Sequence, residues 1–182
     1  MEIVFLIVIG LIVFLVLLWQ LTLLLTSMLT SPTVYANDKA IEDSLKLAGL
    51  KRGESVVDLG CGNAKSLIIA AKKFGAKGIG VEISPYCYFL ARWRVFVLGE
   101  SKNIKIIYGD FTRAEKYLKS ADVVYLYLLN ATLAKIEKWF FSSIGPKTRV
   151  VSLAFVFPNK KPIKSTETFN LRKKTIARLY RK

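Results

Sequence analysis

The chain has 182 residues, enough for one compact domain and a short additional segment. It carries 28 Lys and Arg residues against 13 Asp and Glu residues, so its net charge of +15 indicates a partner or surface of negative charge. Without histidine, and with only Cys61 and Cys87, it cannot use Ser-His-Asp or Cys-His catalysis, histidine-ligated metals or a disulfide framework.

The first segment is apolar and uncharged over residues 3–25. A helix of that length can cross the roughly 30 Å hydrocarbon core of a bilayer. A cleaved signal peptide would have a basic start and a small-residue cleavage site, whereas this segment begins Met1-Glu2 and no Ala-x-Ala sequence follows it. A buried core helix is the other alternative. We therefore predict a membrane anchor with its juxtamembrane start in residues 1–30, and a second domain in residues 31–182.

Charge around the anchor predicts its orientation. No Lys or Arg precedes the apolar segment and many follow it, so the positive-inside rule places the C-terminal domain in the cytoplasm. Residues 159–182 hold nine Lys and Arg against one Glu, and we expect them to contact anionic lipid headgroups. Nucleic acid is the competing partner, because a basic surface alone does not distinguish the two. Trp19 is expected at the membrane interface.

Behind a polar linker, residues 26–37, helical and strand patterns alternate. This alternation predicts an α/β fold with an open, mostly parallel sheet and helices on both faces. Trp93 and Trp139 are expected to pack helices onto the sheet. Helices are predicted over residues 38–47, 66–74, 85–98, 112–118 and 133–141, and strands over residues 55–59, 78–83, 104–108, 123–128, 149–157, 166–171 and 175–180.

A glycine-rich turn follows the first predicted strand. Gly60 permits a tight turn, Gly62 lets a ligand approach the backbone, and Cys61 between them is expected to contribute its backbone N–H rather than its sulfur. Glu82 ends the next strand, 22 residues after Gly60, where a carboxylate that binds ribose hydroxyls belongs. An ordinary solvated strand end is the alternative for Glu82. Together the two elements predict a nucleotide-type cofactor site.

The residues around the turn distinguish between cofactors. Lys65 stands where a dinucleotide motif has its third glycine. Asp58, two residues before Gly60, would repel phosphate but suits a cationic amino-acid tail. The pattern Asp58-x-Gly-x-Gly resembles the motif of the class I methyltransferases, with Ala64 in place of the last glycine. The resemblance implies a Rossmann-like fold and S-adenosyl-L-methionine as the cofactor.

The same resemblance assigns roles to individual residues. Asp58 would order the loop and the cofactor's amino group, Glu82 would bind the ribose, and Ile83 would lie on the adenine. Asp110 and Phe111, directly after the third strand, occupy the position where such enzymes recognise adenine. For Asp110, a helix cap or turn role is an alternative that is compatible with cofactor binding.

A narrower resemblance concerns the substrate. Residues 80–85, followed by Tyr88 and Arg92, look similar to the Glu-x-Asn-Pro stretch of a small lysine methyltransferase family. That family includes an archaeal protein lysine methyltransferase and mitochondrial membrane-anchored enzymes that modify the ATP synthase c subunit and the adenine nucleotide translocase. The similarity covers roughly residues 37–158, with Ser84 in place of the family's Asn and residues 63–65 in place of an Asp-Gly-Arg type sequence.

Candidate catalytic residues follow the fourth strand, because ligands bind at the carboxyl ends of parallel strands. Tyr127 and Asn130 could desolvate and orient an acceptor amine, whose pKa falls on burial. A core role is equally compatible with Tyr127 and is expected for Tyr125. Methyl transfer to an amine needs a neutral amine and correct alignment more than an acid or base, so the lack of histidine is no obstacle.

The sequence thus predicts a membrane-anchored methyltransferase that uses S-adenosyl-L-methionine. Its favoured substrate is a lysine of a membrane-associated protein, with a lipid, a small molecule or RNA as alternatives. Residues 63–65, which depart from the family pattern, motivate a further alternative, a module that binds the cofactor without turnover.

Overall fold

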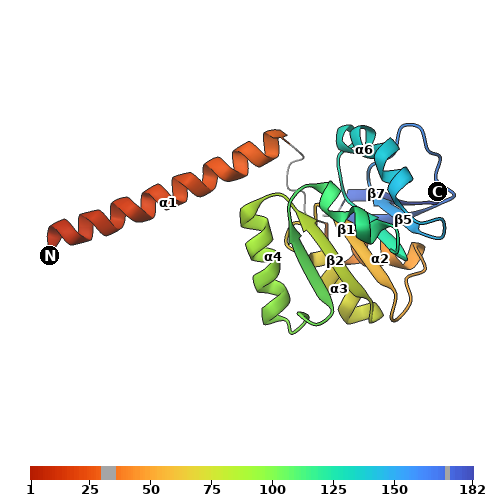
Figure 1. The fold of residues 1–182 in the computed structure, drawn as a ribbon, viewed down its shortest axis with the longest axis horizontal. Helices are drawn as coiled ribbons and strands as arrows, with labels where there is room; N and C mark the ends of the chain where they lie inside the picture. The colour runs from red at the N-terminus through yellow and green to blue at the C-terminus, as the bar shows by residue number, and fades with distance from the viewer. Residues whose placement is uncertain (30–35, 171–172) are drawn as a thin grey trace.

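The computed structural model describes residues 1–29, 36–170 and 173–182, and Figure 1 shows a long helix followed by an α/β domain. The helices are α1 (Glu2–Leu29), α2 (Asp38–Leu47), α3 (Lys65–Phe74), α4 (Pro85–Val97), α5 (Glu115–Leu118) and α6 (Asn130–Ser143), with a 3-10 helix η1 (Phe111–Ala114) before α5. The strands are β1 (Ser55–Leu59), β2 (Lys77–Glu82), β3 (Ile104–Tyr108), β4 (Val123–Leu126), β5 (Arg149–Leu153), β6 (Lys164–Asn170) and β7 (Lys173–Tyr180).

The seven strands form one sheet in the order β3-β2-β1-β4-β5-β7-β6. The five strands β3, β2, β1, β4 and β5 are parallel to one another, while β7 is antiparallel to β5 and β6 is antiparallel to β7. The predicted open, mostly parallel sheet is therefore confirmed. The chain reverses its direction of travel across the sheet between β1 and β4, which is the point where ligands bind in folds of this kind.

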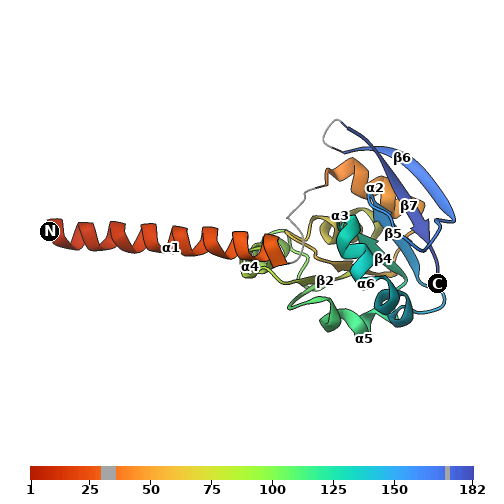
Figure 2. The ribbon, with the colours of Figure 1, turned by 90° about the horizontal axis from the view of Figure 1, so that it is seen from above.

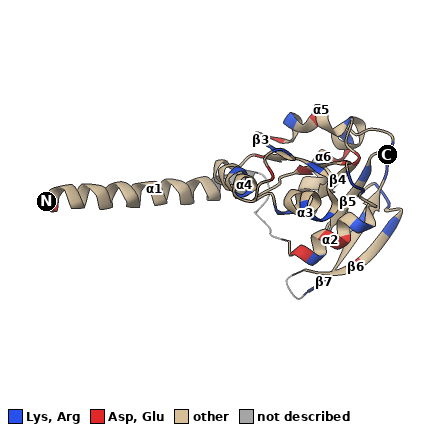
Figure 3. Ribbon diagram, turned by 90° about the horizontal axis from the view of Figure 1, so that it is seen from below, with Lys and Arg blue, Asp and Glu red and all other residues tan. Residues whose placement is uncertain are grey.

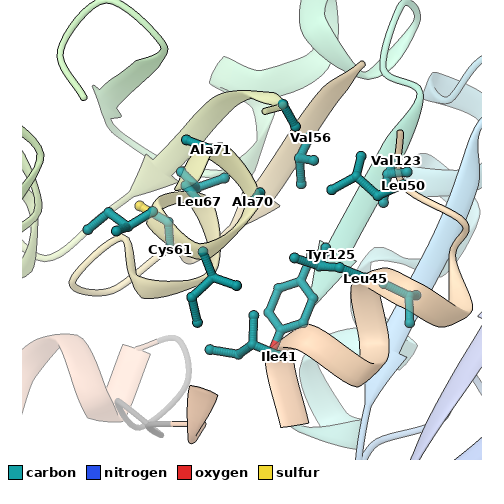
Figure 4. Packing of buried hydrophobic residues seen from close by; sticks show 14 of the residues in the cluster. Ile41, Leu45, Leu50, Val56, Cys61, Leu67, Ala70, Ala71, Val123 and Tyr125 are labelled. Atoms are coloured by element: carbon teal, nitrogen blue, oxygen red, sulfur yellow. The ribbon is translucent and has the colours of Figure 1, made fainter. Parts of the chain in front are cut away.

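Successive residues of the central strands point to opposite faces of the sheet, and each face has its own apolar core. Val56 and Tyr125 belong to the core under α2, α3 and α4, shown in part in Figure 4. Val57 and Leu126 belong to the core under α5 and α6. Tyr125 is 3% exposed, so its expected role in the core is confirmed. Helices thus cover both faces, as predicted.

Local sequence explains where several helices begin and end. The Asn37 side chain caps α2 by accepting a hydrogen bond from the N–H of Ala40 at 2.8 Å. The Ser84 side chain caps α4, whose first residue is Pro85, a residue favoured at that position because its missing N–H has no helical partner. Gly75 ends α3 with a φ of +65°, a left-handed conformation that glycine adopts without strain.

Other expected boundaries were wrong. The strand predicted over residues 149–157 ends at Leu153, because Ala154 has a φ of +66° that turns the chain out of the sheet. Helix α6 begins at Asn130, three residues before its predicted start at position 133. Helix α1 continues to Leu29, into the expected linker. The predicted boundary between residues 30 and 31 and the predicted strand end at position 171 lie outside the described residues.

Helix α1 stands apart from the two cores. Its segment Glu2–Leu24 is long and apolar enough to cross a membrane, and none of it is buried in the protein. This exposure argues against the core-helix alternative; length and composition alone support the membrane span, which stays a prediction. Figure 3 shows α1 free of Lys and Arg along its length. Trp19 packs on Tyr86 of α4, with ring centroids 4.7 Å apart.

Candidate functional site

The turn after β1 forms an open backbone cradle. Gly60 and Gly62 have φ angles of +74° and +54°, which side chains disfavour. The N–H groups of Gly60 and Cys61 both donate to the carbonyl of Val81 on β2, at 2.8 and 3.1 Å, so the turn is fixed to the neighbouring strand. Apart from Gly62 and its two chain neighbours, no atom of the described residues lies within 4 Å of the position a Cβ on Gly62 would take. A ligand can therefore approach the backbone there.

Glu82 connects the turn after β1 to the turn after β2. Its carboxylate accepts hydrogen bonds from the backbone N–H of Gly62 and of Ser84, each at 2.8 Å. The residue is 7% exposed, so it is not the solvated strand end that was the alternative. Burial raises the pKa of Glu82, and the backbone N–H groups oppose that rise. Each oxygen keeps a second lone pair with which it can accept a ligand hydroxyl.

Asp58 lies at the base of the same turn and is 4% exposed. The hydroxyl of Ser66, in the first turn of α3, donates a hydrogen bond to its carboxylate. Burial raises the pKa of Asp58 to about 7; the Ser66 hydrogen bond opposes this effect and the charge of Glu82 adds to it. A buried carboxylate of this kind is stabilised in its ionised form by a cationic group, such as an amino group.

Three further predicted cofactor residues lie around the cradle. The Cys61 side chain is buried against β2, where a Cβ on Gly80 would be 2.6 Å from its sulfur. Its backbone N–H, which was expected to serve the cofactor site, is donated to the Val81 carbonyl and fixes the turn instead. Phe111 is half-buried, and its ring lies 3.8 Å from the position a Cβ on Gly60 would take. Ile83 is half-buried beside Glu82, at the start of the turn after β2. The backbone and Phe111 thus frame the cradle.

Asp110 has the turn role that was its alternative. Its exposed side chain caps η1 by accepting hydrogen bonds from the N–H of Thr112, at 3.0 Å, and from the Thr112 hydroxyl. The Thr112 hydrogen bonds lower the pKa of Asp110. This cap fixes the start of η1 and, with it, the backbone that carries Phe111.

Tyr127 follows directly after β4, which ends at Leu126 and not at the predicted position 128. It is half-buried, and its ring packs near that of Phe155 with centroids 5.7 Å apart. Its hydroxyl oxygen accepts a hydrogen bond from the Asn170 amide at 2.8 Å, and Asn170 in turn accepts one from the backbone N–H of Asn37 at 2.8 Å. Burial raises the pKa of Tyr127, so the hydroxyl keeps its proton and can donate it to another acceptor.

Asn130 has a different environment from Tyr127. It is the first residue of α6 and is exposed, and its side-chain carbonyl accepts a hydrogen bond from the N–H of Val156 at 2.9 Å. The contact joins α6 to the segment after β5. The side-chain oxygen of Asn130 thus has a structural partner, and its expected role toward a substrate stays a prediction.

Sequence reasoning missed several residues that shape the site. Asn170 and Phe155 hold Tyr127, and Ser66 holds Asp58. Lys65 ties the start of α3 to the segment before α2, through the Ala36 carbonyl at 3.1 Å, and to α2 itself, through an ion pair with its first residue Asp38 at 2.6 Å. Asn37 was recognisable as a cap, but the other contacts join elements whose proximity no motif reveals.

The arrangement fits a ligand with three chemical parts. Asp58 suits a cationic amino group, Glu82 suits hydroxyl groups, and Phe111 suits the face of an aromatic ring. Within residues 1–29, 36–170 and 173–182, no group of three or more His, Cys, Asp or Glu residues could hold a metal ion. The site is thus suited to an organic cofactor that carries both a cationic amine and a nucleoside.

Comparisons with known proteins agree with this geometry. A family model described as the ANTKMT methyltransferase domain matches residues 58–164. The human lysine N-methyltransferase of the ATP synthase c subunit is 29% identical over 131 residues, which are 72% of this chain and 54% of that protein. A protein-lysine N-methyltransferase from Saccharolobus islandicus is 30% identical over 125 residues, 68% of this chain and 76% of that protein. This chain therefore spans about half the length of the human relative.

A solved structure gives a similar result. An RNA methyltransferase from Salinibacter ruber, in complex with S-adenosyl-L-homocysteine, superposes with a TM-score of 0.69 and 30% sequence identity. The superposition covers 76% of this chain and 87% of that one. The family match begins at Asp58, the first carboxylate of the cradle, and includes the last two residues of β1 and all of β2, β3, β4 and β5.

Proposed function

The chain belongs to the family of ANTKMT methyltransferase domains, and we propose that it transfers a methyl group from S-adenosyl-L-methionine to lysine side chains of a membrane-associated protein. The predicted cofactor is confirmed by the family match and by the similar structure that binds S-adenosyl-L-homocysteine. The observation that carries the proposal is the pair of buried carboxylates, Asp58 and Glu82, on either side of an open glycine turn. We call the residues around this turn, Asp58, Gly60, Gly62 and Glu82, the donor half of the site.

When bound, the cofactor supplies a methyl group on a positively charged sulfur. In the proposed complex, Asp58 pairs with the cationic amino group and is ionised by it, and Glu82 accepts hydrogen bonds from the ribose. Ile83 and Phe111 contact the adenine, and Gly62 permits close approach of the backbone. Glu82 is held by two backbone N–H groups, so its carboxylate has little freedom left to lose on binding.

The lysine acceptor is proposed to enter on the other side, beside Tyr127, Asn170 and Phe155, which we call the acceptor half. The half-buried Tyr127 and Phe155 rings lower the pKa of an incoming amine by removing water from it. Tyr127 keeps its proton because burial raises its pKa, and since Asn170 donates to the hydroxyl oxygen, the O–H itself is free to position a polar atom of the substrate. Supported by two relatives named as lysine methyltransferases, lysine is the preferred acceptor.

Membrane anchoring by α1, with the domain in the cytoplasm, is part of the proposal. It rests on the exposed apolar segment Glu2–Leu24 and on the many Lys and Arg residues that follow it. The contact of Trp19 with Tyr86 brings α1 to a residue four positions after Glu82. An acceptor lysine at the surface of the same membrane would therefore lie close to the donor half.

RNA is the second candidate substrate, because two observations favour it. The net charge of +15 suits a polyanion, and the Salinibacter ruber neighbour is named an RNA methyltransferase at 30% identity. Lipid and small-molecule acceptors, and cofactor binding without turnover, are the remaining alternatives and become outcomes of the test below.

The test uses the full-length protein with native membranes and methyl-labelled S-adenosyl-L-methionine. Label is followed separately into protein, lipid and RNA, with Glu82→Ala as the blank and Glu115→Ala, an exposed carboxylate on α5, as its matched control. We expect label in protein, recovered as methyl-lysine after hydrolysis, for the unchanged chain and for Glu115→Ala. Label in RNA or lipid would replace the lysine proposal, and cofactor binding without any transfer would favour a binding module.

A further inference from the structure

Helix α4 exposes a row of large apolar side chains. Phe89, Trp93 and Phe96 are 66%, 62% and 74% exposed, and their spacing of four and three residues places them on one side of the helix. Val97 beside them is 58% exposed. We call these four residues the α4 face. The expectation that Trp93 packs a helix onto the sheet is therefore wrong, and an exposed patch of this kind marks an interaction surface.

The opposite side of α4 explains why the large residues point outward. Cys87, Ala91 and Val95 face the sheet, and all three are 4% exposed or less. These small side chains already fill the space between helix and sheet. A helix on the surface of a soluble domain has its large apolar residues on the buried side, and α4 has the reverse arrangement. The sequence of α4 thus supports two apolar contacts, one with the sheet and one with something outside the domain.

A basic group borders the α4 face on one side. A groove of about 670 Å³ lies between α4 and the edge strand β3, and its lining includes Phe89, Trp93 and the exposed Arg92. Lys105 on β3 points to the other face of the sheet, where its ammonium lies 5.8 Å from the centroid of the Tyr117 ring. Aromatic side chains with cationic neighbours are typical of helices that lie in the headgroup region of a bilayer. The positive charge makes a surface rich in anionic phosphate the best electrostatic match.

The position of α1 also favours an anionic bilayer as the partner of the α4 face. Trp19 of α1 packs on Tyr86 in the first turn of α4, so the apolar helix and the α4 face are neighbours. Figures 1, 2 and 3 show α4 at the end of the domain nearest α1, running across the direction of α1. If α1 crosses a bilayer, α4 then lies along the bilayer surface. The α4 face would continue the apolar surface that α1 begins.

We propose that the α4 face rests on an anionic phospholipid bilayer, as a second membrane contact beside α1. Phe89, Trp93 and Phe96 enter the headgroup region, and Arg92 pairs with a phosphate. This contact fixes the distance of the donor half from the bilayer, because α4 begins at the carboxyl end of β2, where the donor half lies. It also places the basic hairpin β6–β7, at the opposite edge of the sheet, away from that bilayer. The arrangement therefore does not favour the expected headgroup contact of residues 159–182.

The test follows the fluorescence of single tryptophans in the full-length chain, inserted into vesicles of phosphatidylcholine and phosphatidylglycerol with brominated acyl chains. Trp93 is the reporter in the variant with Trp19→Phe and Trp139→Phe. Trp19 alone serves as the control for insertion of α1. The matched control for the opposite edge is Phe169→Trp, with all three native tryptophans changed to Phe, because Phe169 on β6 is also exposed at 54%.

We expect the brominated lipids to reduce the fluorescence of Trp93 about twofold, and that of Phe169→Trp hardly at all. Unquenched Trp93 beside quenched Trp19 would overturn the proposal and leave the α4 face to a second copy or another protein. Equal quenching of Trp93 and of Phe169→Trp would also overturn it, because the contact would not be specific to one edge. If the brominated lipids quench neither Trp19 nor Trp93, both the membrane anchor and the α4 contact are rejected.

A further variant tests the charged part of the contact. With Trp93 as reporter, Arg92→Gln should reduce the difference in quenching between vesicles with and without phosphatidylglycerol. The matched control is Lys164→Gln on the far hairpin, and it should keep that difference. If Arg92→Gln keeps the full preference for anionic vesicles, the assignment of Arg92 to a phosphate is wrong.

Discussion

The donor and acceptor halves of the site are assembled in different ways. Asp58 and Glu82 of the donor half come from two adjacent strands. The hydrogen bond that joins Gly62 to Glu82 within this half connects residues 20 positions apart in the sequence. In the acceptor half, the hydrogen bond from Asn170 to Tyr127 spans 43 residues, and the one from Asn37 to Asn170 spans 133. The donor half forms from one short stretch of the chain, whereas the acceptor half forms only when the whole sheet is assembled. Substitutions should therefore separate cofactor binding from turnover.

The largest effect is expected in the donor half, at Glu82. Glu82→Ala leaves the N–H groups of Gly62 and Ser84 without their acceptor and removes the group assigned to the ribose. The dissociation constant for S-adenosyl-L-methionine should rise at least about tenfold, or roughly 1.4 kcal/mol, by titration calorimetry. Glu82→Gln, which keeps one acceptor oxygen, should lose less. An unchanged dissociation constant in Glu82→Ala would reject the cofactor site.

The next effect concerns pH and the buried carboxylate of Asp58. In the free protein its pKa is raised to about 7, because burial and the neighbouring Glu82 disfavour the charged form. The folded state therefore holds this proton more tightly than the unfolded chain, and the free energy of unfolding falls as pH rises from about 4 to 7. A cationic cofactor prefers ionised Asp58, so its affinity should rise by up to about tenfold per pH unit below pH 7 and level off above.

Ser66→Ala sharpens the pH prediction. It removes the hydrogen bond that lowers the pKa of Asp58, so the pH at which affinity levels off should move upward. Calorimetric titrations between about pH 5.5 and 8.5 measure both curves. The charge of Glu82 also acts on Asp58, whereas burial raises the pKa of Cys61 and Tyr125 well above their usual values, so both stay protonated over this pH range. A flat profile, or the same midpoint in Ser66→Ala, would remove Asp58 from the role of amine partner.

In the acceptor half, the expected effect is smaller and of another kind. Tyr127→Phe keeps the ring beside Phe155 and loses only the hydroxyl that Asn170 holds. Loss of one hydrogen bond of about 1 kcal/mol should reduce turnover roughly fivefold, while the dissociation constant of the cofactor stays the same. Asn170→Ala should reproduce the loss in turnover. If either variant weakens cofactor binding as much as it slows turnover, the two halves are not separable.

The same difference between the halves explains what the sequence could predict. Asp58, Gly60, Gly62 and Glu82 form a short pattern whose spacing follows from a strand, a turn and a neighbouring parallel strand, so the donor half was recognisable. Ser66, Asn170 and Phe155 reach the site only because the sheet and α3 bring them there. No periodicity marks them, and the same limit applies to the strand end at Leu153, where the apolar pattern continues while the backbone turns.

The α4 face shows a second limit of pattern reading. An apolar residue in a helix next to a sheet is expected to face the sheet, and Trp93 was interpreted in this way. The structure gives that side to the small residues Cys87, Ala91 and Val95, and leaves Trp93 outside. Both arrangements satisfy the same helical period, so the period alone cannot decide which apolar stripe is buried and which meets a membrane or a partner.

The smallest effect is expected at Asn130, which the sequence placed beside Tyr127 as a catalytic residue. In the structure its carbonyl oxygen accepts from the N–H of Val156, at an exposed position. Asn130→Ala should therefore lower the free energy of unfolding by roughly 0.5–1 kcal/mol, seen as a fall of about 1–4 °C in the melting temperature. Turnover at saturating substrate should stay unchanged, in contrast to Tyr127→Phe. If turnover instead falls severalfold while the melting temperature holds, Asn130 contacts the substrate after all, and the acceptor half extends from the end of β4 into the first turn of α6.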